Sequence, residues 1–341
     1  MSSVSEHLNL LIKKLFKANG GFDTNKIFLA KQLQNVPTND LFPQEHVPPT
    51  GIHTNLVNKF QIANSKEEAD FILVPHEWVK IYKNRNYFSY LQELSKTVPL
   101  VILNTGDVSP EVKIRNVLEL RTFLHPWENL NNKIIIPYPT KPKQFHIRTW
   151  TPIPTISFMG YVPKLSLGAL IGKNARGIKN PIKSSVYINR KLGVLRLNNL
   201  KHKFNINVTT KENFTAYNKN PNLLLDIKNY EESLANSDYI LCPRGFGNTS
   251  IRFYECLSAG RTPIVINSNG RFPFLDKEQE WSEHILEVNI LSDWESVIKN
   301  DWDLLQKSSR YEKRQIKNNK LFITNLEFNV YLTLLFKRFL K

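Results

Sequence analysis

The residues most able to do chemistry in this sequence gather in the segment CPRGFGNTSIRFYECLSAGRTPIVI. Two arginines, Arg244 and Arg252, two glycines, Gly245 and Gly247, and Glu255 fall within twelve positions. A guanidinium fork matches the oxygens of a phosphate group. Glycines let a ligand approach the backbone closely and let a loop adopt positive φ angles. We therefore expect a positively charged pocket for a diphosphate in this segment.

The elements around these residues read as strand, loop and helix. The run SDYILC predicts a strand that Pro243 ends, and Asn248, Thr249 or Ser250 is suited to cap a helix over residues 250–259. Glycine is the residue type most often found just after the end of a helix, and Gly260 occupies that position here. The free amides and partial positive charge of a helix N-terminus favour a phosphate, so the elements and the arginines point to the same ligand.

Glu255 follows Arg252 by three positions, which places both on one face of the predicted helix. A carboxylate beside a phosphate pocket requires hydrogen-bond donors, and ribose hydroxyls supply them at dinucleotide sites. The alternative is an ordinary strand–helix junction at which the arginine and the glutamate form one surface ion pair.

Short apolar runs alternate with helical patterns through most of the 341 residues. In the first half DFILV, PLVILN and KIIIP read as buried parallel strands, with a helix over YLQELSKTV. After prolines clustered between positions 137 and 154, TISFMG and KFNINVT begin a second alternation, and the pattern after Trp281 reads as helical. We predict an α/β fold with Rossmann-like domains over 1–145 and 146–310, a ligand cleft between them, and a helical segment over 311–341 that packs back on the first domain.

The segment from Asp238 to Phe274 resembles the donor-binding signature of the exostosin family, glycosyltransferase family 47. Weaker resemblances occur at SFMG, which ends at Gly160, and at ADFILVP in the first half. The resemblance implies a GT-B-type fold of two facing Rossmann domains, inversion at the anomeric carbon, and a sugar nucleotide that is usually uridine-linked. The absence of the membrane anchor and secretory disulfides of animal and plant relatives favours a cytosolic bacterial or viral enzyme.

Carried over by the resemblance, Arg244 and Arg252 would hold the diphosphate and Glu255 the ribose. Ser250 or nearby backbone amides would assist, and these donor residues complete the set with Gly245, Gly247, Asn248 and Thr249. Arg176, Arg190 or Lys191 would add charge from a facing loop.

An inverting transfer needs a general base for the acceptor hydroxyl. The predicted strand ends in the first domain offer Asp107 first, then Glu77 and His76, of which one is expected to act. Fixed positive charge stabilises a departing diphosphate without a metal. The string Asp301-Trp302-Asp303 falls in helical sequence, and we interpret it as a solvated helix start rather than a metal site. We therefore expect no metal and no cofactor, because the sugar nucleotide is a substrate.

The formal net charge of +16 favours an anionic partner. Only two cysteines, Cys242 and Cys256, and no secretory signal pattern suggest a reducing, cytoplasmic setting, with peripheral contact at the inner face of an anionic membrane. The expected partners are the sugar nucleotide and a glycan or lipid-linked acceptor, without nucleic acid. Two other functions stay open: a basic nucleic-acid-binding or modifying protein, and a non-catalytic membrane-surface protein.

Overall fold

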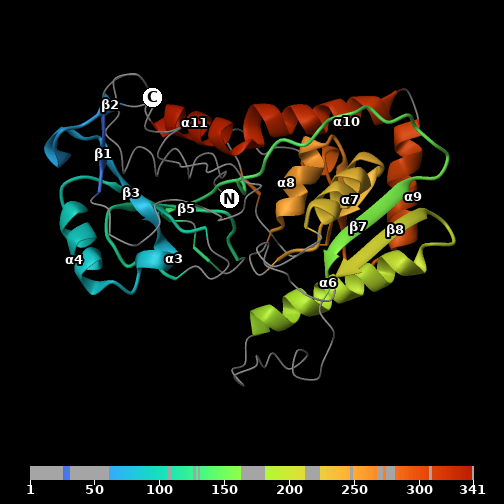
Figure 1. Cartoon of the computed structure of the whole chain (residues 1–341), viewed down its shortest axis with the longest axis horizontal. Helices are drawn as coiled ribbons and strands as arrows, with labels where there is room; N and C mark the ends of the chain where they lie inside the picture. The colour runs from blue at the N-terminus through green and yellow to red at the C-terminus, as the bar shows by residue number, and fades with distance from the viewer. Residues whose placement is uncertain are drawn as a thin grey trace. The chain divides into compact units, whose positions relative to one another are not determined.

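The computed structural model describes residues 26–30, 61–105, 110–125, 128–129, 131–162, 181–211, 223–245, 249–266, 272–273, 281–306 and 309–339. The chain divides into two compact units (Figure 1). The first contains Met1–Lys141, Gly270–Gln279 and Thr324–Lys341, and the second contains Pro142–Asn269 and Glu280–Ile323. The first boundary between the units therefore lies within the proline-rich segment.

The first unit contains a parallel sheet with the strand order β2-β1-β3-β4-β5-β6. Its strands are β1 (Lys26–Leu29), β2 (Gln61–Ile62), β3 (Phe71–Glu77), β4 (Leu100–Leu103), β5 (Val117–Arg121) and β6 (Lys133–Ile135). Its helices are α3 (Trp78–Ile81), α4 (Arg85–Leu94) and α11 (Phe328–Phe339). The three predicted strands are confirmed as β3, β4 and β6. The pattern missed β5, because Glu119 and Arg121 interrupt its apolar residues although both side chains are buried.

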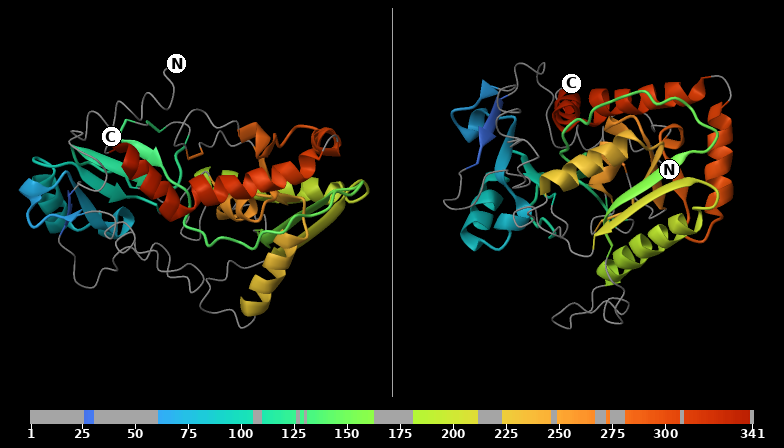
Figure 2. Two further views of the ribbon diagram at one scale, coloured as in Figure 1. Left: turned by 90° about the horizontal axis from the view of Figure 1, so that it is seen from above. Right: turned by 45° about the vertical axis from the view of Figure 1, so that its right-hand side comes forward.

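The second unit contains a parallel sheet with the order β11-β10-β9-β7-β8. The chain is coloured from green to red over this unit in Figure 2. Its strands are β7 (Thr155–Tyr161), β8 (Asn205–Lys211), β9 (Tyr239–Leu241), β10 (Thr262–Ile266) and β11 (Leu286–Val288). Its helices are α6 (Pro181–Asn199), α7 (Leu223–Ala235), α8 (Ile251–Ser258), α9 (Trp294–Gln306) and α10 (Arg310–Leu321). The prediction of continuous helix after Trp281 is wrong at β11, a three-residue strand too short to show a period.

Helices cover both faces of the second sheet, and β9 shows how its residues alternate between them. Tyr239 and Leu241 belong to the core cluster that includes residues of α6 and α9, whereas Ile240 and Cys242 pack with residues of α7 and α8. Alternation of this kind is what strand geometry imposes on a sheet buried on both sides. Together with the first unit, this arrangement confirms the predicted α/β fold class of two Rossmann-like units.

Both sheets have the same connectivity over their first five strands. When the strands of each are numbered from the first, the order is 2-1-3-4-5-6 in the first sheet and 2-1-3-4-5 in the second. In such open sheets the connections reverse direction between the first and third strands, and ligands bind outside the carboxyl ends of the strands at that point. In the second unit this position lies at the carboxyl ends of β7 and β9. In the first unit it lies at the carboxyl ends of β1 and β3.

Candidate functional site

The end of β7, the loop after β9 and the start of α8 meet at the switch point of the second sheet. Arg252, in the first turn of α8, donates from Nε to the carbonyl oxygen of Met159 at 3.0 Å. Its guanidinium carbon lies 5.7 Å from the ring centroid of Phe158. Arg252 forms no ion pair with a carboxylate of the described residues. Among the described residues no acid therefore neutralises its positive charge, which suits an anionic ligand.

Gly160 makes this position of Arg252 possible. A Cβ atom on Gly160 would lie 2.9 Å from Cζ of Arg252 and would overlap Nη2. Real Cβ atoms do not approach other heavy atoms this closely, so any other residue at 160 requires the guanidinium to move. The glycine that ends the pattern SFMG therefore has a local physical reason, because the side chain of Arg252 packs against the end of β7 at this position.

Arg190 connects the same strand end to the loop that follows β9. Its Nη1 donates to the carbonyl oxygen of Tyr161 and its Nη2 to that of Arg244, both at 3.2 Å. Arg190 lies in α6 and not in a loop, which corrects that detail of the sequence prediction. Burial lowers the pKa of the Arg244 guanidinium, which nevertheless stays charged in the physiological range. Three arginines from separate elements thus gather at one edge of the sheet.

Gly245 and Thr249, which precede α8, are joined by a backbone hydrogen bond. The amide of Gly245 donates to the carbonyl oxygen of Thr249 at 2.9 Å. Gly245 does not have a positive φ, so the expected left-handed conformation is wrong at this residue. Ser250 occupies the N-cap position, as predicted, but its side chain makes no capping hydrogen bond. The amide of Phe253 donates to the carbonyl oxygen of Ser250 at 3.0 Å, whereas the Ser250 side chain does not cap the amides of Ile251 and Arg252. A phosphate suits amides of this kind.

The end of α8 confirms the role predicted for Gly260. This residue has φ of +73°, its amide donates to the carbonyl oxygen of Leu257, and the amide of Arg261 donates to that of Cys256. These two bonds form a Schellman motif, which ends a helix. Cys242 and Cys256 are both buried in the apolar layer under α8, as expected for structural thiols.

Glu255 faces α7 and the segment before β7. Its Oε2 accepts a hydrogen bond from the hydroxyl of Tyr230 at 2.6 Å, and its Oε1 lies 3.7 Å from Nζ of Lys143. The surface ion pair with Arg252, the alternative considered from the sequence, is not formed. The side chain of Glu255 is 15% exposed, so part of the carboxylate remains accessible.

Four of the candidate residues lie outside the described residues: Gly247, Asn248, Arg176 and Asp107. The other two candidate bases lie at the end of β3, at the switch point of the first sheet. His76 is fully buried, with its ring against that of Tyr87 at 5.7 Å between centroids. Glu77 is 6% exposed and accepts a hydrogen bond from the hydroxyl of Thr105 at 2.5 Å. Of these two side chains, Glu77 lies closer to the strand end.

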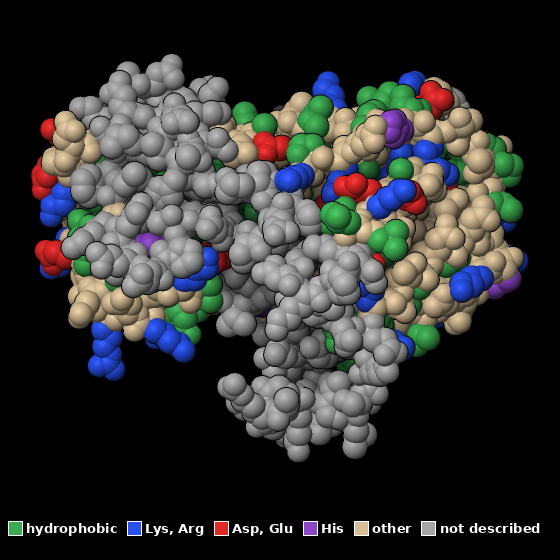
Figure 3. All heavy atoms as spheres, viewed as in Figure 1, with side chains coloured by type: hydrophobic (Ala, Val, Ile, Leu, Met, Phe, Trp, Pro, Cys, Tyr) green, Lys and Arg blue, Asp and Glu red, His purple; other side chains and the backbone are tan. Residues whose placement is uncertain are grey.

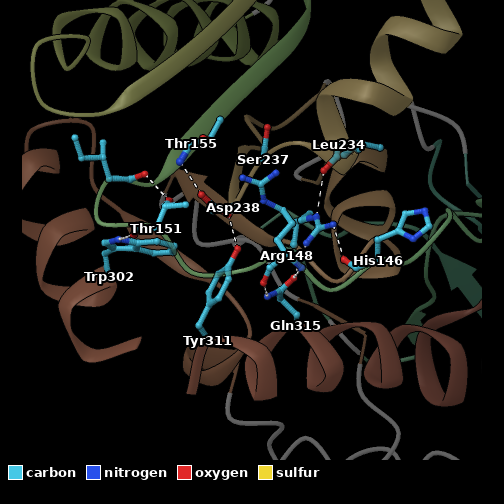
Figure 4. Close-up of polar contacts among 12 residues, drawn as sticks. His146, Arg148, Thr151, Thr155, Leu234, Ser237, Asp238, Trp302, Tyr311 and Gln315 are labelled. Carbon is cyan, nitrogen blue, oxygen red and sulfur yellow. Dashed lines mark hydrogen bonds and ion pairs between the residues drawn. The ribbon is translucent and has the colours of Figure 1, made fainter. Parts of the chain in front are cut away.

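The opposite edge of the second sheet contains a buried network that the sequence analysis missed (Figure 4). Asp238 accepts hydrogen bonds from Nε of Arg148 at 2.8 Å, from the amide of Thr155 at 2.7 Å, and from the hydroxyl of Tyr311. This network lies at the amino ends of β7 and β9, away from the loop. Its residues therefore stabilise the unit rather than contact a ligand. No local sequence pattern marks them.

The Asp301-Trp302-Asp303 string is helical, as predicted, but it lies in the second half of α9 rather than at its start, and only Asp303 of the three residues is exposed. Asp301 accepts hydrogen bonds from the hydroxyl of Tyr239 at 2.5 Å and from Nη1 of Arg314 at 2.7 Å. Trp302 is buried and donates to the carbonyl oxygen of Thr151 at 3.0 Å. Asp301 and Trp302 thus take part in interactions within the unit, whereas Asp303 is exposed to solvent.

Comparison with protein families gives a match over residues 182–321 to the RXYLT1 C-terminal domain, an exostosin-like glycosyltransferase family. The matched range runs from the start of α6 to the end of α10. The match supports the predicted class of enzyme, a glycosyltransferase, over this part of the chain.

Solved structures with a distant likeness include the GtfA/B complex, at 10% identity and a TM-score of 0.37 over 79% of this chain. The chain spans 57% of the length of that relative. The catalytic domain of Starch Synthase IV from Arabidopsis thaliana, bound to ADP and acarbose, matches at 9% identity with a TM-score of 0.39. That match covers 80% of this chain and 73% of the synthase domain. The alpha-glucosyltransferase AGT in complex with UDP matches at 10% identity with a TM-score of 0.39. That match covers 93% of this chain and 100% of AGT.

Proposed function

We propose that this chain transfers a sugar from a nucleoside diphosphate sugar, most simply a UDP-sugar, to a hydroxyl group of a glycan or glycolipid. The observation that supports this proposal is the gathering of Arg190, Arg244 and Arg252 at the switch point of the second sheet. This is the position at which an open α/β sheet binds a ligand. The first turn of α8 adds the amides of Ile251 and Arg252, which the Ser250 side chain does not cap.

The chemistry follows from where charge develops during transfer. As the glycosidic bond to the diphosphate breaks, negative charge builds on the leaving oxygen, and guanidinium groups held in place stabilise it without reorganising. Arg252 is held by Met159 and Arg190 by Tyr161, so both are positioned before a ligand binds. We propose that the departure of the diphosphate needs no metal for this reason, and that the reaction inverts the anomeric carbon.

A base is needed on the acceptor side, and Glu77, His76 and Asp107 stay candidates. Alanine at the true base is expected to abolish turnover and to leave the dissociation constant of the donor unchanged. Normal turnover in all three alanine variants would refute the assignment of the general base to these three residues.

A thermal-shift screen with UDP, GDP, CMP and ADP sugars tests the donor class, since a ligand that binds only the folded state raises its melting temperature. The variant with Arg244→Gln and Arg252→Gln is expected to lose that shift. Arg196→Gln is the matched control, because Arg196 is an exposed arginine of α6 outside the site. An undiminished shift in the double variant would refute the proposal.

The acceptor side of the proposal includes contact with an anionic membrane. Residues 129–211 contain 15 lysines and arginines and no aspartate or glutamate, which leaves 31 basic and 30 acidic residues in the rest of the chain. Within that range α6 exposes Leu192 (37%) and Leu195 (45%) next to the exposed Arg196. Apolar side chains flanked by cations are typical of helices that lie in a membrane interface. No described helix combines the length and the apolar composition of a membrane span.

Co-sedimentation with vesicles of phosphatidylcholine alone or with phosphatidylserine tests this contact. Binding is expected only to the anionic vesicles and should weaken with salt and in the variant Leu192→Ser/Leu195→Ser. Leu291→Ser is the control, because Leu291 is 84% exposed elsewhere in the unit.

The nucleic-acid function would instead be favoured if the protein bound RNA or DNA and the leucine substitutions left that binding unchanged. On the face shown in Figure 3 lysine and arginine side chains stand apart rather than in one stripe, which argues against that function.

A further inference from the structure

Tyr230, in α7, reaches across to α8 and holds one oxygen of Glu255. The two residues are 25 positions apart in the sequence, and the Tyr230 hydroxyl lies 2.6 Å from Oε2 of Glu255. Burial raises the pKa of the Tyr230 hydroxyl well above its usual value, and the negative charge of Glu255 raises it further. The hydroxyl therefore stays protonated and donates to Glu255 throughout the physiological pH range.

Lys143 approaches the other oxygen without occupying it. Its Nζ lies 3.7 Å from Oε1 of Glu255, which is longer than a hydrogen bond, and 3.2 Å from Oε1 of Glu231. The backbone of Lys143 is itself fixed, because its amide donates to the hydroxyl of Ser258 in α8 at 2.7 Å. The ammonium group thus lies beside Oε1 without donating a hydrogen bond to it.

A carboxylate offers about four acceptor positions on its two oxygens. The hydrogen bond from Tyr230 to Oε2 fixes the orientation of the group, and the side chain is 15% exposed, so part of the carboxylate remains accessible to further donors. We infer that Tyr230 and Lys143 are positioning residues, which orient Glu255 for the ribose hydroxyls of the nucleotide and so give the site its preference for ribonucleotides. This inference rests on the proposed function, because it requires a nucleotide at the site.

The test measures the dissociation constants of UDP and 2′,3′-dideoxy-UDP by calorimetry. The corresponding diphosphates of guanosine, adenosine and cytidine are measured in the same pairs, each ribonucleotide with its dideoxy form. The ratio within each pair isolates the ribose hydroxyls and does not depend on the base or on the active fraction of a preparation. Wild-type protein is expected to prefer the ribonucleotide. Tyr230→Phe is expected to lower that preference by roughly 2- to 10-fold, the equivalent of one hydrogen bond, while the affinity for the dideoxynucleotide stays the same.

Tyr239→Phe is the matched control. It removes another tyrosine–carboxylate hydrogen bond of the same unit, from Tyr239 to Asp301, away from the glycine loop. It should leave the ratio unchanged. Lys143→Met is a second variant that keeps the Tyr230 hydroxyl, and it is expected to lower the ratio in the same direction.

The outcomes separate the two proposals. If Tyr230→Phe weakens both members of a pair equally, Tyr230 merely joins two helices, and the inference is overturned while nucleotide binding stands. If wild-type protein binds none of the four diphosphates, the proposed function itself fails, and the role of Tyr230 fails with it.

Discussion

Replacing Gly160 by alanine should move one arginine of the site and leave the fold intact. The added Cβ would lie 2.9 Å from Cζ of Arg252, at the far end of a flexible side chain. The guanidinium can swing away, at the loss of its hydrogen bond to Met159 and its position over Phe158. Because no backbone has to shift for that overlap, we expect a cost in folding free energy below about 1 kcal/mol.

The effect on binding should be larger than the effect on stability. A hydrogen bond between charged partners contributes about 1.5–3 kcal/mol. If Arg252 contacts the diphosphate and alanine displaces it, the dissociation constant of UDP should rise roughly 10- to 100-fold. Gly193→Ala is the control, because its Cβ would meet Cδ1 of Ile266 in the core at 2.6 Å, so it should affect stability and not affinity.

A double-mutant cycle measured by titration calorimetry decides the matter. Gly160→Ala and Arg252→Ala act through the same guanidinium, so the double variant should bind UDP no more weakly than Arg252→Ala alone. Additive losses, or unchanged affinity in Gly160→Ala, would refute the argument that Gly160 serves Arg252.

Further predictions concern stability, pH and metal. Asp238→Asn should lower the free energy of unfolding of the second unit by about 3–5 kcal/mol in urea titrations, because it breaks a buried network that contains a charge. The control Asp293→Asn, at an exposed residue, should change that free energy far less. Burial lowers the pKa of His284 below 6.5, so the unfolded chain binds the proton more readily, and stability should fall as pH drops below about 6.5. His284→Gln should flatten that fall in a melting series from pH 7 to 5, and an unchanged slope would contradict it. EDTA should leave transferase activity unchanged; complete loss with rescue by manganese would disprove metal independence.

Local pattern was sufficient for the strand, loop and helix around Arg244. The run from β9 to β10 is continuous in the sequence, so periodicity, Pro243 and Gly260 marked its parts without reference to the rest of the chain. The same reasoning failed where local signals conflict with burial. In β5 the charged Glu119 and Arg121 lie inside the unit, because Arg121 pairs with both Glu119 and Glu128.

The sequence by itself determined the two α/β halves, and it pointed to the class of enzyme and to the arginines beside the glycine loop, because these depend on periodicity and on residue types within short segments. Only the tertiary structure decided which groups meet. Arg252 reaches Met159 across 93 positions, and Arg190 reaches Arg244 across 54. Such contacts follow from the order of strands in the sheet, which brings β7 beside β9, and no pattern within a short window contains that order.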